Sequence, residues 1–308
     1  GKKENTTGKK RQELLNQMWR NTCINDTYEP GSVFKIVTAT AGLELGKVKV
    51  TDHFSCPGFR IVEDRKIRCH KTTGHGAETF KEGVMNSCNP VFMEVGARVG
   101  VDGMYTIFRQ MGLFEKTGID IPGEANSIMH NKKNVGAVEL ATMSFGQSFQ
   151  ITPLQLMRAA SAAVNGGTLV TPHFGMKAVD SSGKTVKTFE FAKKKNVIKK
   201  ETSETMRELL EAVVSEGSGR NCKIEGYSIG GKTATSEKLP RGTGKYISSF
   251  LGFSKAEHPT VMALVMIDEP KGTYYGGTIA APVVREVFKV ALPYLGISKD
   301  YTVDKTKK

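Results

Sequence analysis

Two short strings in this chain contain the residue types of an activated serine nucleophile. Ser32 and Lys35 are three positions apart, so on a helix the lysine lies one turn after the serine and its amine can take the serine's proton. Ser87 supplies a second hydroxyl that can pass protons, and Asn89 supplies an amide that can hold a peptide bond of a substrate. Together the two strings predict acyl transfer through a serine, with the lysine as its base.

A third string, Lys232-Thr233-Ala234-Thr235, reads as a strand that carries a fixed cation at the edge of a site. Its two threonines add hydroxyl groups beside the lysine. A cation with neighbouring hydroxyls suits a single carboxylate of a substrate.

The rest of the sequence predicts the helices and strands that would position these residues. The segment 33–43, which follows Pro30-Gly31, predicts a buried helix with Ser32 at its amino terminus, where free N–H groups favour developing negative charge. A hairpin is expected over 54–69, with its turn at Glu63-Asp64. Further helices are expected over 78–86, 90–99, 103–112, 136–142, 153–164, 201–216 and 281–295, and strands over 227–235, 246–253 and 260–267.

The three strings occur in the order that penicillin-binding proteins and class A β-lactamases share. The wider text resembles the transpeptidase domain of class B penicillin-binding proteins, of the sporulation and division type. The similar stretches lie between about Trp19 and Ile297, and they read DTYEPGS at 26–32, NSCNP at 86–90, KTGIDIPG at 116–123 and SFGQ at 144–147.

This resemblance implies an α+β architecture, the penicillin-binding and serine β-lactamase-like transpeptidase fold, in which helices flank an antiparallel sheet beside an all-α lobe. We therefore expect residues 1–308 to form one catalytic domain, with a mostly helical lobe over about 33–165 and a sheet lobe over about 166–300. The family's amino-terminal membrane anchor and pedestal are expected to be absent, because Ser32 follows so soon after the start of this chain.

The implied activity is that of a serine D,D-transpeptidase, which cross-links peptidoglycan stem peptides through an acyl-enzyme and is a target of β-lactams. The resemblance assigns catalysis to Ser32, Lys35 and Ser87, and substrate binding to Asn89, Lys232, Thr233 and Thr235. It implies no cofactor for catalysis. The implied partners are D-Ala-D-Ala stem peptides, β-lactams and a glycosyltransferase of wall synthesis, at the extracytoplasmic face of the bacterial cytoplasmic membrane.

Two other activities share the same motifs. A β-lactam-binding sensor or scaffold would acylate without turnover, and a D,D-carboxypeptidase or β-lactamase would hydrolyse its acyl-enzyme. No string in this sequence supplies the glutamate-bearing loop of class A β-lactamases, so synthesis is favoured. The family usually has Lys-Thr-Gly where this chain has Ala234 in third place, and the extra methyl is expected to reduce the fit of bulky cephalosporins.

We predict that four side chains, those of Cys56, Cys69, His75 and Cys88, form a zinc site. The expected hairpin would bring Cys56 and Cys69 opposite each other, and Cys88, between Ser87 and Asn89, should point back toward that hairpin. Three thiolates and an imidazole would close a tetrahedral structural site. The alternatives are a Cys56–Cys69 disulfide and buried free thiols, and His70 or Asp64 could replace His75 or Cys56 as a ligand.

Composition limits the classes of function. The 308 residues, 39% of them hydrophobic, are enough for a sizeable core, and no run of about 18 apolar residues predicts a membrane span. We interpret the net charge of +13 mainly as a contribution to solubility, and partly as suited to a place beside anionic lipid or anionic wall polymer. The basic residues are scattered and accompany no nucleic-acid-reading motif, so nucleic-acid binding is not expected.

Overall fold

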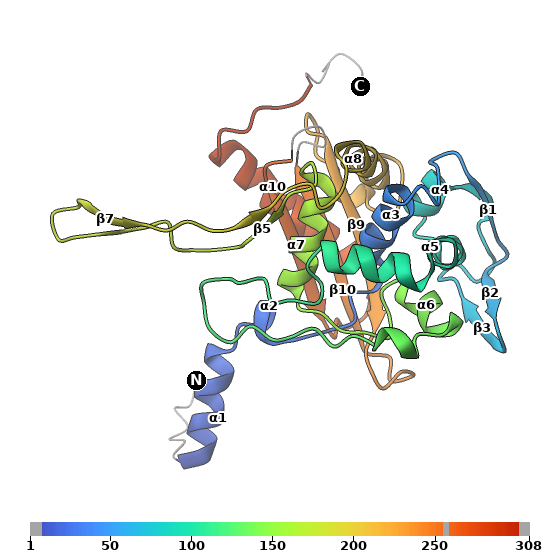
Figure 1. The fold of residues 1–308 in the computed structure, drawn as a ribbon, viewed down its shortest axis with the longest axis horizontal. Helices are drawn as coiled ribbons and strands as arrows, with labels where there is room; N and C mark the ends of the chain where they lie inside the picture. The colour runs from blue at the N-terminus through green and yellow to red at the C-terminus, as the bar shows by residue number, and fades with distance from the viewer. Residues whose placement is uncertain (1–7, 255–258, 302–308) are drawn as a thin grey trace.

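An antiparallel sheet runs through the middle of the molecule (Figure 1), in a computed structural model that describes residues 8–254 and 259–301. Its strands are β9 (Ile229–Glu237), β10 (Tyr246–Ser254) and β11 (Met262–Asp268), in the order β11-β10-β9. Side chains alternate between the two faces of the central strand, as its period of two requires. Phe250 packs with the carboxyl-terminal helix, whereas Leu251 joins the larger helical core.

Helices cover both faces of this sheet, and each buries an apolar stripe. On one face α10 (Ala281–Tyr294) places Val284 and Phe288 against Phe250. On the other face α8 (Lys200–Ser215) packs against β9 and α7 (Pro153–Val164) against β11, and α3 (Lys35–Glu44) packs against both of these helices. The helix α3 is buried along almost its whole length, so it forms the centre of the core.

Several of the remaining helices lie beside α3, on the side away from α10 (Figure 1). The longest, α5 (Asn89–Gln110), joins the two helices expected over 90–99 and 103–112 and is kinked where Gly100 has φ +74°. The others are α1 (Gly8–Trp19), α2 (Thr22–Asn25), α4 (Phe80–Met85), α6 (Ala137–Met143) and α9 (Gly276–Ile279), with 3-10 turns η1 (Gly31–Phe34), η2 (Lys132–Asn134) and η3 (Arg220–Cys222). No helix of the described residues has both the length and the apolar character needed to cross a membrane.

The strands near the cysteines pair differently from the expectation. A single hairpin over 54–69 is wrong: β2 (Phe59–Val62) pairs with β3 (Arg65–Arg68) around the expected turn, but β1 (His53–Cys56) pairs with β4 (Gly76–Thr79). Cys56 is therefore paired with Gly76 in the β1–β4 ladder, whereas the expected hairpin would have paired it with Cys69. Between β1 and β2, Pro57 has no N–H to donate to a ladder and Gly58 turns the chain with φ +94°, so β1 does not continue the β2–β3 pair.

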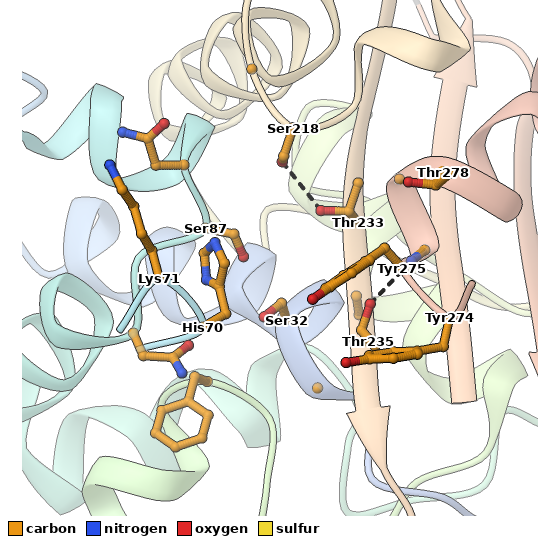
Figure 2. A pocket seen from close by; sticks show the side chains of 18 of the residues that line it. Ser32, His70, Lys71, Ser87, Ser218, Thr233, Thr235, Tyr274, Tyr275 and Thr278 are labelled. Atoms are coloured by element: carbon orange, nitrogen blue, oxygen red, sulfur yellow. Dashed lines mark hydrogen bonds between the residues drawn. The ribbon is translucent and has the colours of Figure 1, made fainter. Parts of the chain in front are cut away.

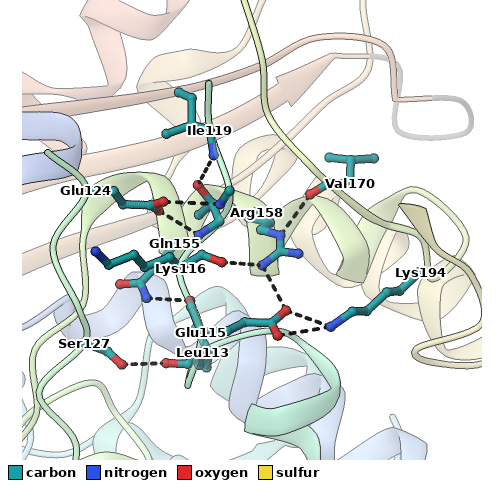
Figure 3. A network of polar contacts seen from close by, with 12 residues as sticks. Leu113, Glu115, Lys116, Ile119, Glu124, Ser127, Gln155, Arg158, Val170 and Lys194 are labelled. Carbon is teal, nitrogen blue, oxygen red and sulfur yellow. Dashed lines mark hydrogen bonds and ion pairs between the residues drawn. The ribbon is translucent and has the colours of Figure 1, made fainter. Parts of the chain in front are cut away.

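A long arm leaves the body between α7 and α8 (Figure 1). It is built from the pair β5 (Leu169–Val170) and β8 (Lys193–Lys194) and, farther out, the pair β6 (Lys177–Val179) and β7 (Thr185–Thr188). A polar network fixes its base (Figure 3): the buried Arg158 donates to the carbonyl of Val170, and Glu115 pairs with both Arg158 and Lys194. The loop that carries Glu115 is thereby held against α7.

Candidate active site

Residues of all three strings line one cleft of about 740 Å³ beside β9. They are Ser32, Ser87 with Asn89, and Thr233 with Thr235. Ser32 lies at its centre, with His70 and Ser87 on one wall and Thr233, Thr235 and two tyrosines on the other (Figure 2). The walls come from distant parts of the chain, which the packing of η1 against β9 and of α3 against α5 brings together.

Ser32 is held by two glycines whose backbones touch. Gly31 has φ +54°, and a Cβ at that position would lie 1.9 Å from Ser236 Oγ. Gly146 has φ +86°, and a Cβ there would lie 2.0 Å from the carbonyl oxygen of Gly31. The N–H of Gly31 donates to the carbonyl of Gly146 at 2.8 Å. Only glycine fits either position, so both fix the turn that presents Ser32.

Lys35 begins α3 and is buried at 1% exposure. Its ammonium donates to the carbonyl oxygen of Ser87 (2.7 Å), to Ser87 Oγ (3.2 Å) and to Asn89 Oδ1 (2.7 Å). Burial lowers its pKa from 10.5 to about 8, against the opposing effects of Cys69, Cys88 and Glu78. Within the described part of the chain Lys35 makes no hydrogen bond to Ser32, so proton transfer needs a small movement of the amine or passage through Ser87.

The hydroxyl of Ser87 joins the second and third strings. It accepts a hydrogen bond from Lys232 Nζ at 2.8 Å in addition to the bond from Lys35. Burial, and then repulsion by Lys35, lower the pKa of Lys232 well below its usual value. Two ammonium groups at one hydroxyl repel each other. One of the two lysines therefore loses its proton more easily than an isolated lysine would. Ser87 can then donate to the neutral amine, which makes it a proton shuttle.

The structure gives Lys232 a place that its sequence pattern does not reveal. Lys232 lies on β9 with 1% exposure and is behind the cleft wall, which its neighbours Thr233 and Thr235 help to form. Thr233 Oγ1 is 3.2 Å from Ser218 Oγ, and Thr235 Oγ1 accepts from the N–H of Gly276 at 3.0 Å. A carboxylate in the cleft would therefore meet hydroxyls first, with the lysine behind them.

Ala234 is a buried residue of β9 at the edge of the cleft, next to the serine turn. It is 3% exposed, and its Cβ is 3.6 Å from the position that a Cβ on Gly31 would take. The methyl group thus faces the turn that carries Ser32.

Sequence reasoning missed several residues of the cleft wall. Tyr246, Tyr274 and Tyr275 form a stack, with ring centroids 4.2 Å and 4.8 Å apart, and all three line the cleft. Tyr274 and Tyr275 lie opposite His70 (Figure 2). Ser218, in a short link after α8, completes the row of hydroxyls. The run Tyr274-Tyr-Gly-Gly277 was the available signal, because two glycines after two aromatics mark a close approach of backbone to a site.

The predicted metal ligands converge directly behind the Ser87 turn. The ligand atoms of Cys56, Cys69, His75 and Cys88 all lie within 4.8 Å of one another. Cys88, the N-cap residue of α5, is fully buried with its sulfur in this cluster, whereas its neighbours Ser87 and Asn89 line the cleft. All five cysteines of the chain are free thiols, including Cys56 and Cys69.

The alternative ligands lie less favourably. Asp64 is on the β2–β3 turn, its side chain is 86% exposed, and it pairs with Arg65. His70 Nδ1 lies 3.8 Å from Cys69 Sγ, as does His75 Nδ1, but the His70 side chain is exposed in the cleft. A hydrogen bond from the Cys88 thiol lowers the pKa of Cys69, and the same bond raises the pKa of Cys88.

Comparison with known proteins identifies the family. Residues 1–289 match the family described as the penicillin binding protein transpeptidase domain. Stage V sporulation protein D of Bacillus subtilis is 45% identical over 284 residues, which are 90% of this chain and 44% of that protein. A probable peptidoglycan D,D-transpeptidase PenA of Neisseria flavescens is 32% identical over 288 residues, 91% of this chain and 68% of that protein.

Solved structures agree with the sequence matches. The transpeptidase domain of penicillin-binding protein 3 from Burkholderia pseudomallei superposes with a TM-score of 0.80 at 26% identity, over 92% of this chain and 84% of that one. A putative peptidoglycan glycosyltransferase from Atopobium parvulum gives 0.80 at 28%, over 90% and 65%. The expected α+β fold is confirmed, and the chain belongs to the penicillin-binding protein transpeptidase family.

Proposed function

We propose that this chain is a serine D,D-transpeptidase that cross-links peptidoglycan stem peptides. The observation that carries the proposal is the meeting of three sequence strings at Ser87, whose hydroxyl is bonded by Lys35 and Lys232 beside Ser32. The chain spans 44% of the length of the Bacillus relative, so this assignment concerns the residues given.

The proposed reaction begins when Ser32 Oγ attacks the carbonyl between the two D-alanines and Lys35 takes its proton. The backbone N–H groups of Ser32 and Thr235 stabilise the resulting oxyanion. Ser87 passes a proton to the departing D-alanine amine, and an ester on Ser32 remains. An acceptor amine then attacks this ester and gives up a proton along the same route, which restores the Ser32 hydroxyl.

We assign substrate recognition to Asn89 and to the cleft wall that contains Thr233 and Thr235. Thr233 and Thr235, with Lys232 behind them, bind the terminal carboxylate of the stem peptide or the acid group of a β-lactam. The amide of Asn89 donates to the carbonyl of Arg68 and accepts from Lys35, which fixes its plane beside the cleft. No cofactor takes part in these steps.

Intact-mass spectrometry after benzylpenicillin treatment tests the nucleophile. We expect one adduct per chain, lost in Ser32→Ala because that variant has no hydroxyl to acylate. An adduct that persists in Ser32→Ala contradicts the assignment. Rapid release of free enzyme would instead indicate a hydrolase, and acylation without cross-linking of lipid II beside a polymerase would indicate a sensor.

The wider setting follows from the relatives and is part of the proposal. We place the catalytic residues in one domain of two lobes, about 33–165 and 166–300, working at the extracytoplasmic face of the bacterial cytoplasmic membrane. Its partners would be peptidoglycan strands and a glycosyltransferase that makes them. The 45% identity to a stage V sporulation protein favours a role in sporulation.

We further propose that Cys56, Cys69, His75 and Cys88 hold a structural zinc ion. Support comes from ligand atoms within 4.8 Å of one another, from their types, and from the burial of the three cysteines. The ion would brace the turn that carries Ser87 and Asn89, without entering the reaction.

Metal analysis tests the zinc proposal. Because binding free energy at a structural site becomes folding free energy, removal of zinc by a chelator should lower the melting temperature, and Cys88→Ser should weaken both stability and penicillin acylation. Less than about one zinc per five chains, with unchanged melting in chelator, would favour the free-thiol alternative.

A further inference from the structure

Glu78 is a buried carboxylate that the proposed reaction does not use. It lies on β4 opposite Phe54, with only 4% of its surface exposed. Its Oε2 accepts a hydrogen bond from Asn86 Nδ2 at 3.1 Å, whereas its Oε1 is buried and has no hydrogen-bond partner among the residues that the structure describes. A buried anionic oxygen without a partner is costly, so a group that supplies one is expected.

The unpartnered oxygen faces the cysteine and histidine cluster. Glu78 Oε1 lies 3.9 Å from His75 Nδ1, which itself lies 3.8 Å from Cys69 Sγ. The side chains of His75 and Glu78 are 8% and 3% exposed, so water does not screen the pair. A cation among the four ligands would attract this oxygen, and an N–H of a metal-bound imidazole could donate to it.

We propose that Glu78 is a fifth member of the metal centre and couples it to the catalytic turn. The inference rests on the zinc site proposed above. One carboxylate oxygen serves the centre, through His75 or the ion itself, while the other keeps Asn86 in place. Glu78 is in this sense a positioning residue, because it touches neither substrate nor Ser32.

The coupling passes through a short and rigid segment. Asn86 lines the cleft and immediately precedes Ser87, whose φ of +55° is uncommon for a residue other than glycine. The backbone N–H of Asn86 donates to the carbonyl of Glu82 at 2.7 Å, so its side chain and main chain are both anchored. A shift of Glu78 on loss of the ion would therefore move the residue that sets the backbone of Ser87.

Glu78→Gln separates the two duties of the carboxylate, because an amide offers one acceptor oxygen where the carboxylate offers two. We expect its zinc dissociation constant to rise about tenfold or more, as measured by competition with the chromophoric chelator 4-(2-pyridylazo)resorcinol. Glu78→Asp keeps the charge on a shorter side chain and should bind zinc with intermediate affinity.

Glu82→Gln is the matched control. Glu82 lies four residues further on and caps α4 by accepting from Thr79, away from the cluster. Its loss should lower the melting temperature and leave zinc affinity within twofold of the unmodified protein. A purely structural role for Glu78 would give the same pattern as this control.

The second readout is benzylpenicillin acylation with and without zinc. In the unmodified protein, acylation should slow when zinc is removed, and in Glu78→Gln the difference should shrink. Zinc binding by the unmodified protein with affinity unchanged in both Glu78 variants would overturn this inference alone. Absence of zinc binding in the unmodified protein would overturn the zinc site and this inference together, while the serine reaction would still stand on its own test.

Discussion

At the scale of single residues, the chemistry depends on two lysines that burial prevents from behaving as ordinary surface cations. Lys35 and Lys232 are each 1% exposed, and both donate to Ser87 Oγ. Desolvation disfavours the ammonium form, and mutual repulsion disfavours two ammonium groups together. The site therefore contains an amine that can accept a proton near neutral pH.

The lowered pKa of Lys35 predicts a pH dependence of acylation. An unperturbed lysine stays charged up to about pH 10.4, whereas Lys35 becomes neutral above about 8. If its neutral amine is the base, the second-order rate constant with benzylpenicillin should rise about tenfold per pH unit from pH 6 and level off above about 8. A profile that is flat from pH 6 to 10 would exclude Lys35 as the base.

Ala234→Gly tests the effect of the additional methyl group. Removing a methyl that faces the serine turn should let the cleft accept larger ligands, so acylation by a bulky cephalosporin should increase by up to about tenfold relative to benzylpenicillin. Glycine within a strand should also lower the free energy of unfolding by about 1 kcal/mol. Equal changes for both antibiotics would show that the methyl does not control access.

At the scale of elements, the serine turn is positioned by close contacts on two sides. The turn η1 lies between short side chains of β9 and the loop at Gly146, and on that loop it makes a backbone hydrogen bond and close backbone contacts. Such contacts leave no room for adjustment, since backbone atoms cannot rotate away as side chains do.

Gly146→Ala should therefore displace Ser32. The new Cβ would meet the carbonyl of Gly31, and φ +86° is strained for alanine, so we expect a loss of about 2 kcal/mol or more in the free energy of unfolding, together with slower acylation. Gly46→Ala is the control: it has φ +62° but no atom within 4 Å of the added Cβ. Urea unfolding and adduct formation measure both effects, and slow acylation in Gly46→Ala would point to general destabilisation.

At the scale of the whole molecule, the excess of positive charge is the least specific feature. The net charge is +13, and several lysines lie on the exposed arm between α7 and α8. Such a charge predicts a long-range attraction to anionic wall polymer that requires no dedicated binding site.

Binding to isolated anionic wall polymer should therefore be sensitive to salt and independent of catalysis. Retention should fall steeply as ionic strength rises from about 0.01 M to 1 M, where the screening length shortens from about 30 Å to about 3 Å. Ser32→Ala should bind as well as the unmodified chain. Retention that survives high salt would instead indicate a specific contact.

The sequence by itself determined the fold class, the family and the residue strings at the cleft. These are local properties: Ser32 and Lys35 lie within one helical turn, and helical or strand periodicity extends over single segments. The elements expected over 153–164, 201–216 and 281–295 match α7, α8 and α10 to within a residue. The four side chains proposed for zinc also came from the sequence, although the strand pairing assumed for Cys56 was wrong.

Only the tertiary structure decided how these strings act on one another. Lys232 lies 145 positions from Ser87 along the chain, so no local pattern could reveal that it bonds the Ser87 hydroxyl from beneath the cleft. The role of Glu78 was hidden for the same reason, because an acidic residue on a short strand is ordinarily solvated. Burial, free hydrogen-bonding capacity and the pKa shifts they cause are set by the packing of distant segments, and a linear sequence does not contain them.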